Sequence, residues 1–378
     1  MQFRDLKKQY ESLKPQMDAA VSEVLTEANY ISGRQVAELE KKLADYVGVK
    51  HCITCGNGTD ALSLALMVWG IGEGDAVFVP DFTFFASAET AAYEGATPVF
   101  TDILEDTFNM DPDSLERVIQ AVLKEGKLRP KVIVTVDLFG LPADYDRIQK
   151  IADKYGLYIL EDAAQGFGGM YHGRRAGSLG DLATTSFFPA KPLGCYGDGG
   201  AVFTDRDDWA ELLRSYRVHG KGQDKYDNVR IGINSRLDTL QAAVLNVKLQ
   251  AFQEYELADS DQKAQTYTEG LQDCVRVPVI PEGLLSGWAQ YSILFRDQKE
   301  RDEAEAYLKE QGIPCMIYYP RGMHQQTAFR GCDTYGEDFM VTNRVCARVL
   351  AIPLSPYLTE EDQQKVIRLI RKKTGADV

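Results

Sequence analysis

The chain has 378 residues, enough for a large α/β unit and a smaller second one. Its 42 basic and 56 acidic residues give a formal net charge of −14, which argues against nucleic acid or an anionic membrane surface as a general partner. The N-terminal segment lacks the apolar core of a secretory signal, and no stretch approaches the roughly 18 consecutive apolar residues of a membrane span, so we expect a cytosolic protein.

Apolar residues with helical spacing open the chain, at residues 17–25 and 36–46. From there to residue 204, short β-rich runs alternate with helical segments. Nearly continuous apolar strands with helices between them predict a buried, mostly parallel sheet. The expected strands are 76–80, 97–101, 131–136, 157–161, 183–188 and 200–204, and the expected helices are 87–93, 113–124 and 144–155.

The last third of the chain has a different order of elements. Residues 235–271 have a helical pattern over most of their length and lead into a second unit. We expect a large α/β domain at 1–250 and a smaller α+β domain at 251–378. The elements expected in the smaller domain are a strand at 288–295, a helix at 302–311, a strand at 314–319 and a helix at 359–372 that Thr359 caps.

The seven cysteines are an odd number scattered along a long chain, which is typical of reduced thiols. Cys52 and Cys55 form a C-x-x-C pair, but no second pair of cysteines or histidines follows at ligand spacing. The sequence therefore predicts no metal site.

A glycine loop, Cys55-Gly-Asn-Gly-Thr-Asp-Ala61, fits the dinucleotide fingerprint G-x-G-x-x-A. Asp81 lies near the spacing of the acidic residue that would bind a ribose. However, Pro80 precedes it, and some fifty residues precede the loop, whereas a dinucleotide domain usually opens on its glycine-loop strand. A nicotinamide or flavin cofactor is therefore the less favoured alternative. Small residues before a helix still favour a phosphate ligand.

Three downstream residues are typical of a pyridoxal phosphate site. Asp162 ends a predicted strand, Gln165 follows one turn later, and Lys191 lies in the loop after another strand. Taken singly, each has an ordinary structural interpretation, such as a helix cap or a solvated charge. Together with the glycine loop they supply a Schiff-base lysine, a carboxylate for the pyridine nitrogen and a phosphate cradle. All of them follow strands, where ligands of parallel sheets bind.

Seven motifs are spread along essentially the whole chain. They are Phe3-Arg-Asp-Leu6, Gly58-Thr-Asp-Ala-Leu62, Pro80-Asp-Phe-Thr-Phe84, Glu161-Asp-Ala-Ala-Gln165, Ser186-Phe-Phe-Pro-Ala-Lys-Pro-Leu193, Gly197-Asp-Gly-Gly-Ala201 and Gly232-Ile-Asn-Ser-Arg-Leu-Asp-Thr-Leu-Gln-Ala-Ala243. These motifs resemble the DegT/DnrJ/EryC1/StrS family of nucleotide-sugar aminotransferases. The resemblance implies the aspartate aminotransferase fold (pyridoxal phosphate fold type I) and a homodimer with shared active sites.

By the same resemblance, Lys191 would form the Schiff base and Asp162 would pair with the pyridinium nitrogen. Gln165 would lie by the phenolic oxygen, and Phe84, in preference to Phe82, would stack on the ring. The residues expected at the phosphate are Gly58, Thr59 and Ser186 of one subunit and Asn234 of the other.

Arg236 is expected to face substrate, with a surface charge as the alternative. His219 and His324 are further candidates for substrate binding and are equally compatible with structural roles. Some relatives replace the lysine with histidine and catalyse dehydration, so Lys191 predicts transamination. Ser235 replaces an aromatic residue of many relatives, which makes the chain resemble enzymes that act on 3-oxo UDP-sugars.

The expected function is therefore amination of a 3-oxo UDP-sugar, of the UDP-3-oxo-N-acetylglucosaminuronate type. L-Glutamate is the expected amino donor, and cell-surface polysaccharide or O-antigen synthesis is the expected pathway. One alternative is a 4-keto sugar linked to UDP or dTDP. A second is an inactive, pyridoxal-phosphate-binding regulatory or interaction protein, although Lys191 and Asp162 are both retained.

Overall fold

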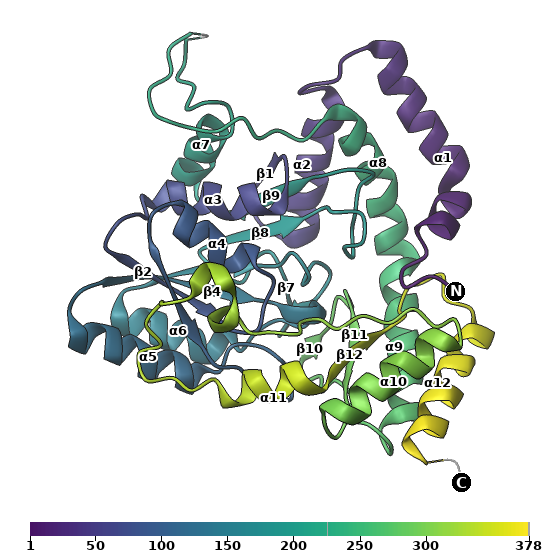
Figure 1. Cartoon of the computed structure of the whole chain (residues 1–378). Coiled ribbons are helices and arrows are strands. Elements are labelled where there is room, and N and C mark those ends of the chain that lie inside the picture. Colours follow the sequence, from purple (N-terminus) through teal and green to yellow (C-terminus); the bar gives the residue numbers. More distant parts are fainter. Residues whose placement is uncertain (225, 377–378) are drawn as a thin grey trace.

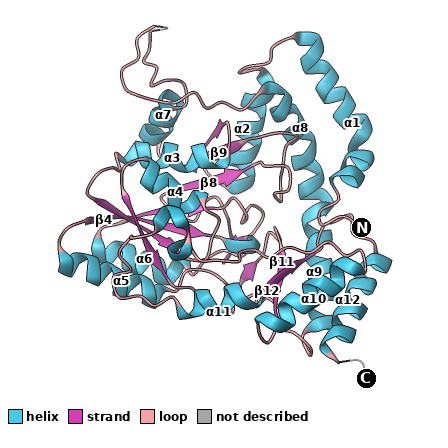
Figure 2. Cartoon of the chain, in the orientation of Figure 1, coloured by secondary structure: helices cyan, strands magenta, loops and turns pink. Residues whose placement is uncertain are grey.

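A seven-stranded sheet lies at the centre of this computed structural model, which describes residues 1–224 and 226–376 (Figures 1 and 2). In spatial order its strands are β1 (His51–Cys55), β9 (Gly200–Thr204), β8 (Leu182–Ser186), β5 (Tyr158–Asp162), β4 (Arg129–Val136), β2 (Asp75–Pro80) and β3 (Thr97–Thr101). Strand β9 is antiparallel to β1 and β8, and the other neighbours are parallel. The predicted mostly parallel sheet is confirmed.

Side chains of the central strands alternate between two packed faces. In β2, Val77 and Val79 pack into one core, while Ala76 and Phe78 pack into the core on the other side. The first face is covered by α3 (Gly58–Trp69), α4 (Ala86–Tyr93) and α7 (Asp207–Tyr216). The second is covered by α5 (Pro112–Glu125) and α6 (Tyr145–Tyr155), and beyond them by α2 (Arg34–Val47) and α8 (Thr239–Ala251).

The N-terminal helix α1 (Leu6–Glu27) begins eleven residues before the expected helix at 17–25. The side chain of Asp5 caps it by accepting a hydrogen bond of 2.9 Å from the Lys8 amide. Leu13 and Met17 pack α1 onto the core formed with α2 and α8. Across the described residues, none of the helices combines the length and apolarity needed to span a bilayer.

A continuous helical run links the sheet to the C-terminal part of the chain. Helix α8 passes through a π-helical turn, η2 (Phe252–Glu256), into α9 (Leu257–Leu271). A separate core then forms around a two-stranded sheet. Its elements are α9, β11 (Tyr291–Leu294), α10 (Gln298–Glu310), β12 (Val349–Ile352) and α12 (Glu360–Thr374).

The structure differs from the sequence-based expectation at two strands of this part. Residues 314–319 form no ladder; Met316 makes a single bridge to Ala351. The strand expected at 288–295 shortens to β11 because Trp288 has φ of 48°, outside the extended region. A short three-stranded sheet also joins β10 (Leu284–Leu285) to β6 (Met170–Tyr171) and β7 (Arg174–Arg175).

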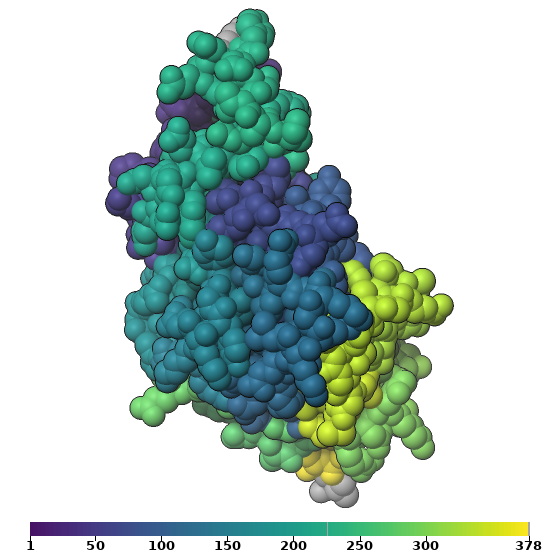
Figure 3. Space-filling model, turned by 90° about the vertical axis from the view of Figure 1, so that its left-hand side faces the viewer, coloured from purple at the N-terminus to yellow at the C-terminus, as the bar shows by residue number. Residues whose placement is uncertain are grey.

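The segment between β11 and β12 returns to the large sheet. Met323, Phe329 and Phe339 pack into the same core as α3 and α4, followed by residues of α11 (Met340–Arg348). Figure 3 shows this yellow-green segment lying against the blue atoms of the first part of the chain. The division into domains at residues 250 and 251 stays a prediction, and it falls inside the continuous helical run.

Candidate active site

A cavity of about 660 Å³ opens where the parallel strands end. Its walls come from the segments that follow β1, β2, β5 and β8, whose C-terminal ends share one edge of the sheet. This is the edge at which parallel α/β sheets bind their ligands. Seven of the residues predicted from the sequence line it, namely Gly58, Thr59, Phe84, Asp162, Gln165, Ser186 and Lys191.

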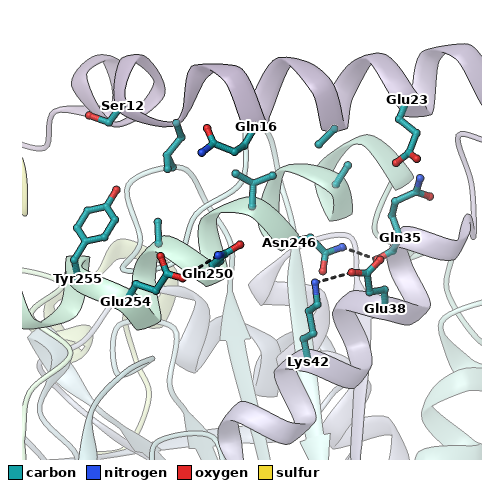
Figure 4. Close-up of a pocket in the computed structure, with 15 residues that line it drawn as sticks. Ser12, Gln16, Glu23, Gln35, Glu38, Lys42, Asn246, Gln250, Glu254 and Tyr255 are labelled. Carbon is teal, nitrogen blue, oxygen red and sulfur yellow. Dashed lines mark hydrogen bonds and ion pairs between the residues drawn. The ribbon is translucent and has the colours of Figure 1, made fainter.

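A second cavity, of about 510 Å³, lies away from the strand ends between α1, α2 and α8 (Figure 4). The charged groups labelled there are already paired along the helix surfaces. Lys42 bonds Glu38, and Gln250 bonds Glu254. We therefore place the active site in the cavity at the strand ends.

The glycine loop forms one end of this cavity. Asn57 caps α3, because its side-chain oxygen accepts from the Asp60 amide at 2.8 Å, and Gly58 and Thr59 begin the helix. A Cβ atom on Gly58 would lie 2.7 Å from Cβ of Ser186, so glycine allows the helix N-terminus to touch the end of β8. A helix N-terminus beside a serine hydroxyl is suited to a phosphate group.

Substitution of Gly58 by alanine should weaken cofactor binding. The added methyl group would push α3 away from Ser186, and overpacking of this kind costs about 1–3 kcal/mol, which is roughly ten-fold or more in Kd. Equilibrium titration of cofactor-free protein with pyridoxal phosphate would measure the change. Gly72→Ala is the matched control, since its new Cβ would meet its nearest atom at an ordinary 3.6 Å. Equal affinities in the two variants would contradict the assignment of the loop.

Asp162 lies at the end of β5 and is held by hydroxyl and amide donors. Ser87 donates to its Oδ2 at 2.7 Å and the Ala164 amide to its Oδ1 at 3.2 Å, while Thr83 lies 3.1 Å from the Ser87 hydroxyl. Burial raises the pKa of this carboxyl, and the two donors and the charge of Lys191 oppose the rise. Nothing in the sequence pattern marked Ser87, which lies in the first turn of α4, four residues after Thr83.

Lys191 reaches the cavity from the loop between β8 and β9. Burial lowers the pKa of its amine, Asp162 raises it, and the nearby charge of Arg4 lowers it further. A lysine whose neutral form is favoured is suited to act as a nucleophile or base.

Aromatic residues and Gln165 also line the cavity. The Gln165 side chain accepts from the Phe139 amide at 2.8 Å and donates to the Tyr319 hydroxyl at 3.0 Å. Phe84 is 53% exposed and faces the cavity, whereas Phe82 is fully buried among other rings. This difference supports Phe84 over Phe82 as the residue that stacks on a ring.

Four of the predicted residues lie outside the set of described residues that lines the cavity. Asn234 and Arg236 lie on the loop between α7 and α8, joined by a hydrogen bond of 2.8 Å. His219, on the same loop, is exposed. His324 Nδ1 lies 2.6 Å from Oδ2 of the fully buried Asp81, which gives that aspartate a structural partner. The roles predicted for these four residues stay predictions.

Ser235 anchors this loop to the glycine loop. Its hydroxyl accepts from the Gly56 amide at 2.8 Å and donates to Asp60 at 2.6 Å. Arg217, at the start of the same loop, donates to Glu40 and to the Thr54 carbonyl, each at 2.6 Å. Figure 1 shows the described residues on both sides of position 225 in this loop projecting from the body of the molecule above α7.

Two buried carboxyl groups, Asp137 and Glu161, lie behind the cavity. Burial raises the pKa of Glu161, and the backbone amides that it accepts from Gly177, Leu179 and Gly180 oppose this rise. Burial and the charge of Glu161 raise the pKa of Asp137 well above its usual value, which favours the protonated form of Asp137 in the folded protein.

The proton on Asp137 predicts a pH-dependent stability. A raised folded pKa contributes stability that is complete below the unfolded pKa, near 4, and is lost as the pH rises towards the folded pKa. Asp137→Asn needs no such proton. Its stability relative to the wild type should increase as the pH rises above the unfolded pKa, by up to about 1.4 kcal/mol per pH unit. Urea unfolding at each pH would measure this gain, and a constant difference between the two proteins would contradict it.

The residues present fit pyridoxal phosphate. The glycine that lets α3 approach Ser186 leaves helix amides for a phosphate, and Asp162 is a buried carboxylate that a protonated pyridine nitrogen can pair with. Phe84 offers an open ring face, and Lys191 offers an amine within the same cavity. The cofactor supplies an aldehyde carbon and a ring that accepts electrons.

Comparisons with known proteins agree with this geometry. A model of the DegT/DnrJ/EryC1/StrS aminotransferase family matches residues 11–371. The chain is 43% identical, over 95% of its length and 96% of the relative, to the UDP-2-acetamido-2-deoxy-3-oxo-D-glucuronate aminotransferase of Pseudomonas aeruginosa. It is 41% identical, over 97% of its length and 96% of the relative, to the Pleiotropic regulatory protein of Geobacillus stearothermophilus.

A crystal structure of a DegT DnrJ EryC1 StrS aminotransferase from Brucella abortus is also similar. It superimposes with a TM-score of 0.97 over 99% of this chain and all of that one, at 51% identity. The agreement extends over nearly the whole chain and confirms the predicted fold.

Proposed function

Because the chain belongs to the DegT/DnrJ/EryC1/StrS aminotransferase family, we propose that it transfers an amino group to the keto carbon of a 3-oxo UDP-sugar. Like the family, it is an aminotransferase that depends on pyridoxal phosphate. One observation carries the proposal. Lys191 and Asp162 follow neighbouring strands and meet the N-terminus of α3 in a single cavity.

In this proposal the residues of the cavity have separate roles. Gly58, Thr59 and Ser186 hold the phosphate, and Asp162 keeps a proton on the pyridine nitrogen. Lys191, as a neutral amine, takes the proton from the α-carbon of L-glutamate. It later returns a proton to the sugar carbon that gains the nitrogen. The lowered pKa of Lys191 supports this role, because a base must be unprotonated to act.

The sugar itself is proposed from the relatives and from the loop around Ser235. Ser235 is small and buried where a larger side chain would displace Asp60 and Gly56. In this proposal Arg236, beside it, pairs with a carboxylate or phosphate of the substrate. We propose a UDP-linked 3-oxo sugar, used in the cytosol for a cell-surface polysaccharide such as an O-antigen.

A panel of UDP- and dTDP-linked 3-keto and 4-keto sugars, each assayed with L-glutamate, tests this assignment. Mass spectrometry of the aminosugar would identify the product, and we expect the 3-oxo UDP-sugar to be turned over fastest. Equal or faster turnover of a 4-keto sugar would overturn the preference.

The similarity to a relative named as a regulatory protein favours the regulatory alternative. Addition of glutamate alone separates the two functions. An enzyme should lose the absorbance of the bound cofactor and release 2-oxoglutarate, whereas a binding protein without activity should do neither.

We also propose that two chains form a homodimer and share their active sites. The loop between α7 and α8 carries exposed apolar side chains, including Tyr226 at 86%, Val229 at 54% and Ile231 at 89% exposure. Grouped exposed apolar residues on a projecting loop are typical of a protein interface. In the dimer, Asn234 of this loop would reach the phosphate in the cavity of the partner subunit.

Mixing two inactive variants tests the shared site. If Asn234 acts across the interface, Lys191→Ala chains mixed with Asn234→Ala chains form heterodimers with one complete site. At equal amounts, about a quarter of wild-type activity should return, because half of the dimers are mixed and each has one site.

The control replaces the Lys191→Ala chain by the double variant Lys191→Ala/Asn234→Ala. Its mixture with Asn234→Ala contains the same number of lysines and no intact asparagine. Recovery in the control, or none in the first mixture, would show that Asn234 does not act across the interface.

A further inference from the structure

The loop that carries Lys191 joins β8 to the antiparallel strand β9 and folds back on itself. The Phe187 amide bonds the Gly199 carbonyl at 2.7 Å, and the Cys195 amide bonds the Phe187 carbonyl at 2.8 Å. Further along the loop are the carbonyl oxygens of Pro192 and Gly194, neither of which belongs to the described residues that line the cavity. Pro192 directly follows Lys191 and Gly194 lies three residues after it, so groups that hold these carbonyls also restrain the backbone of the lysine.

Two cationic side chains from distant parts of the sequence hold these carbonyls. Arg4, just before α1, donates from Nη2 to the Pro192 oxygen at 3.2 Å. Lys248 of α8 donates from Nζ to the Gly194 oxygen at 2.6 Å, and its Nζ lies 4.6 Å from the centroid of the Tyr196 ring. Lys248 is 1% exposed, and lysine is seldom so deeply buried without a specific partner.

A buried carboxylate balances the two charges. Glu256, in the π-helical turn after α8, accepts from Gln9 at 2.7 Å and from the Tyr357 hydroxyl at 2.6 Å. Burial lowers the pKa of Lys248 to about 8; Glu256 and the Cys195 thiol raise it, and Arg4 lowers it. These groups and the Tyr196 ring surround the Lys248 amine, and Asp162 and Arg4 act on Lys191.

We propose that Arg4 and Lys248 are positioning residues for Lys191: they hold the Pro192 and Gly194 carbonyls and thereby fix where the lysine amine enters the cavity. The inference rests on the role proposed for Lys191. Neither cation lines the cavity among the described residues, so both act through the backbone. Because a nearby positive charge disfavours a second one, Arg4 also favours the neutral form of Lys191.

The test follows the absorbance of the holoprotein against pH, which reports proton binding at the bond between Lys191 and the cofactor. Arg4→Gln and Lys248→Met each remove a charge and a carbonyl contact. Arg4→Gln should raise the midpoint by about half a pH unit or more, a three-fold change in proton affinity, because the protonated form is no longer opposed by the Arg4 charge. Both variants should also speed release of the cofactor on dilution about three-fold or more, because the loop is less well held.

Two variants serve as controls. Arg4→Lys keeps the charge and should restore the wild-type midpoint. Lys7→Met makes the same substitution as Lys248→Met at a site whose side chain is 85% exposed, and should change neither quantity. Because Arg4 precedes α1 and lies outside any helix, Arg4→Gln decides the question if Lys248→Met does not fold.

The outcomes distinguish a positioning role of the two cations, a purely structural role, and failure of the proposed function itself. Variants that unfold at a lower temperature but keep the wild-type midpoint and release rate would overturn the inference, since the cations would then stabilise the fold alone. A shift of the same size in Lys7→Met would also overturn it. A wild-type protein in which borohydride fixes no cofactor on Lys191 would contradict the proposed function itself.

Discussion

Lys191→Ala is expected to lower kcat for transamination by roughly 10³-fold or more. In the proposed function this residue both attaches the cofactor and acts as the base, and a general base alone contributes about 10²–10⁴-fold. The variant should still bind pyridoxal phosphate through the glycine loop, Ser186 and Asp162, but without a covalent bond. Borohydride treatment followed by peptide mass spectrometry would measure that bond, and a glutamate half-reaction would measure the rate.

The matched control for this substitution is Lys150→Ala, an exposed lysine of α6 outside the set of described cavity residues. It should keep covalent attachment and the rate of the half-reaction. Covalent fixation in Lys191→Ala, or a rate within ten-fold of wild type, would show that another amine does the chemistry.

Asp162→Asn is the second variant with a large expected effect. An amide cannot hold a proton on the pyridine nitrogen, so the ring would accept electrons less well and the half-reaction should slow by roughly 10²-fold or more. The fold should persist, because asparagine is of the same size and Ser87 can still donate to its oxygen. Stopped-flow absorbance after mixing with L-glutamate would measure the rate.

Ser87→Ala separates the charge of Asp162 from its placement. It removes one donor to the carboxylate and leaves the charge, so a smaller decrease, of about ten-fold or less, is expected. A half-reaction of Asp162→Asn within three-fold of wild type would contradict the role of the carboxylate.

The central sheet could be predicted because its strands are apolar on both faces and are spaced by helices. Ends of elements were harder to predict. Helix α10 begins at Gln298, four residues before the expected helix, because Asp297 caps it by accepting from the Glu300 amide. Strand β12 was not expected, because its four residues directly follow α11 and are extended through pairing with β11, a contact that no local pattern encodes.

The cavity residues of one chain were predictable to a large extent. Lys191, Asp162 and Gly58 each follow a strand, and parallel strands bring their ends together whatever the sequence between them. Ser87 and Tyr319 were harder to assign, because their positions depend on how α4 and the segment after residue 314 pack. The positions of Asn234 and Arg236 relative to a substrate could not be predicted from local patterns, because in the proposed dimer they depend on a second chain.

The position of β1 at the edge of the sheet affects when the glycine loop can fold during translation. His51 pairs with Thr204, so the strand that leads into the glycine loop meets its neighbour β9 about 150 residues later in synthesis. At a translation rate of about 5–20 residues per second, that delay is on the order of 10–30 seconds. A ribosome-bound chain that ends before residue 204 therefore carries the glycine loop without the sheet that places it. We expect the growing chain to acquire its cofactor only after β9 has emerged.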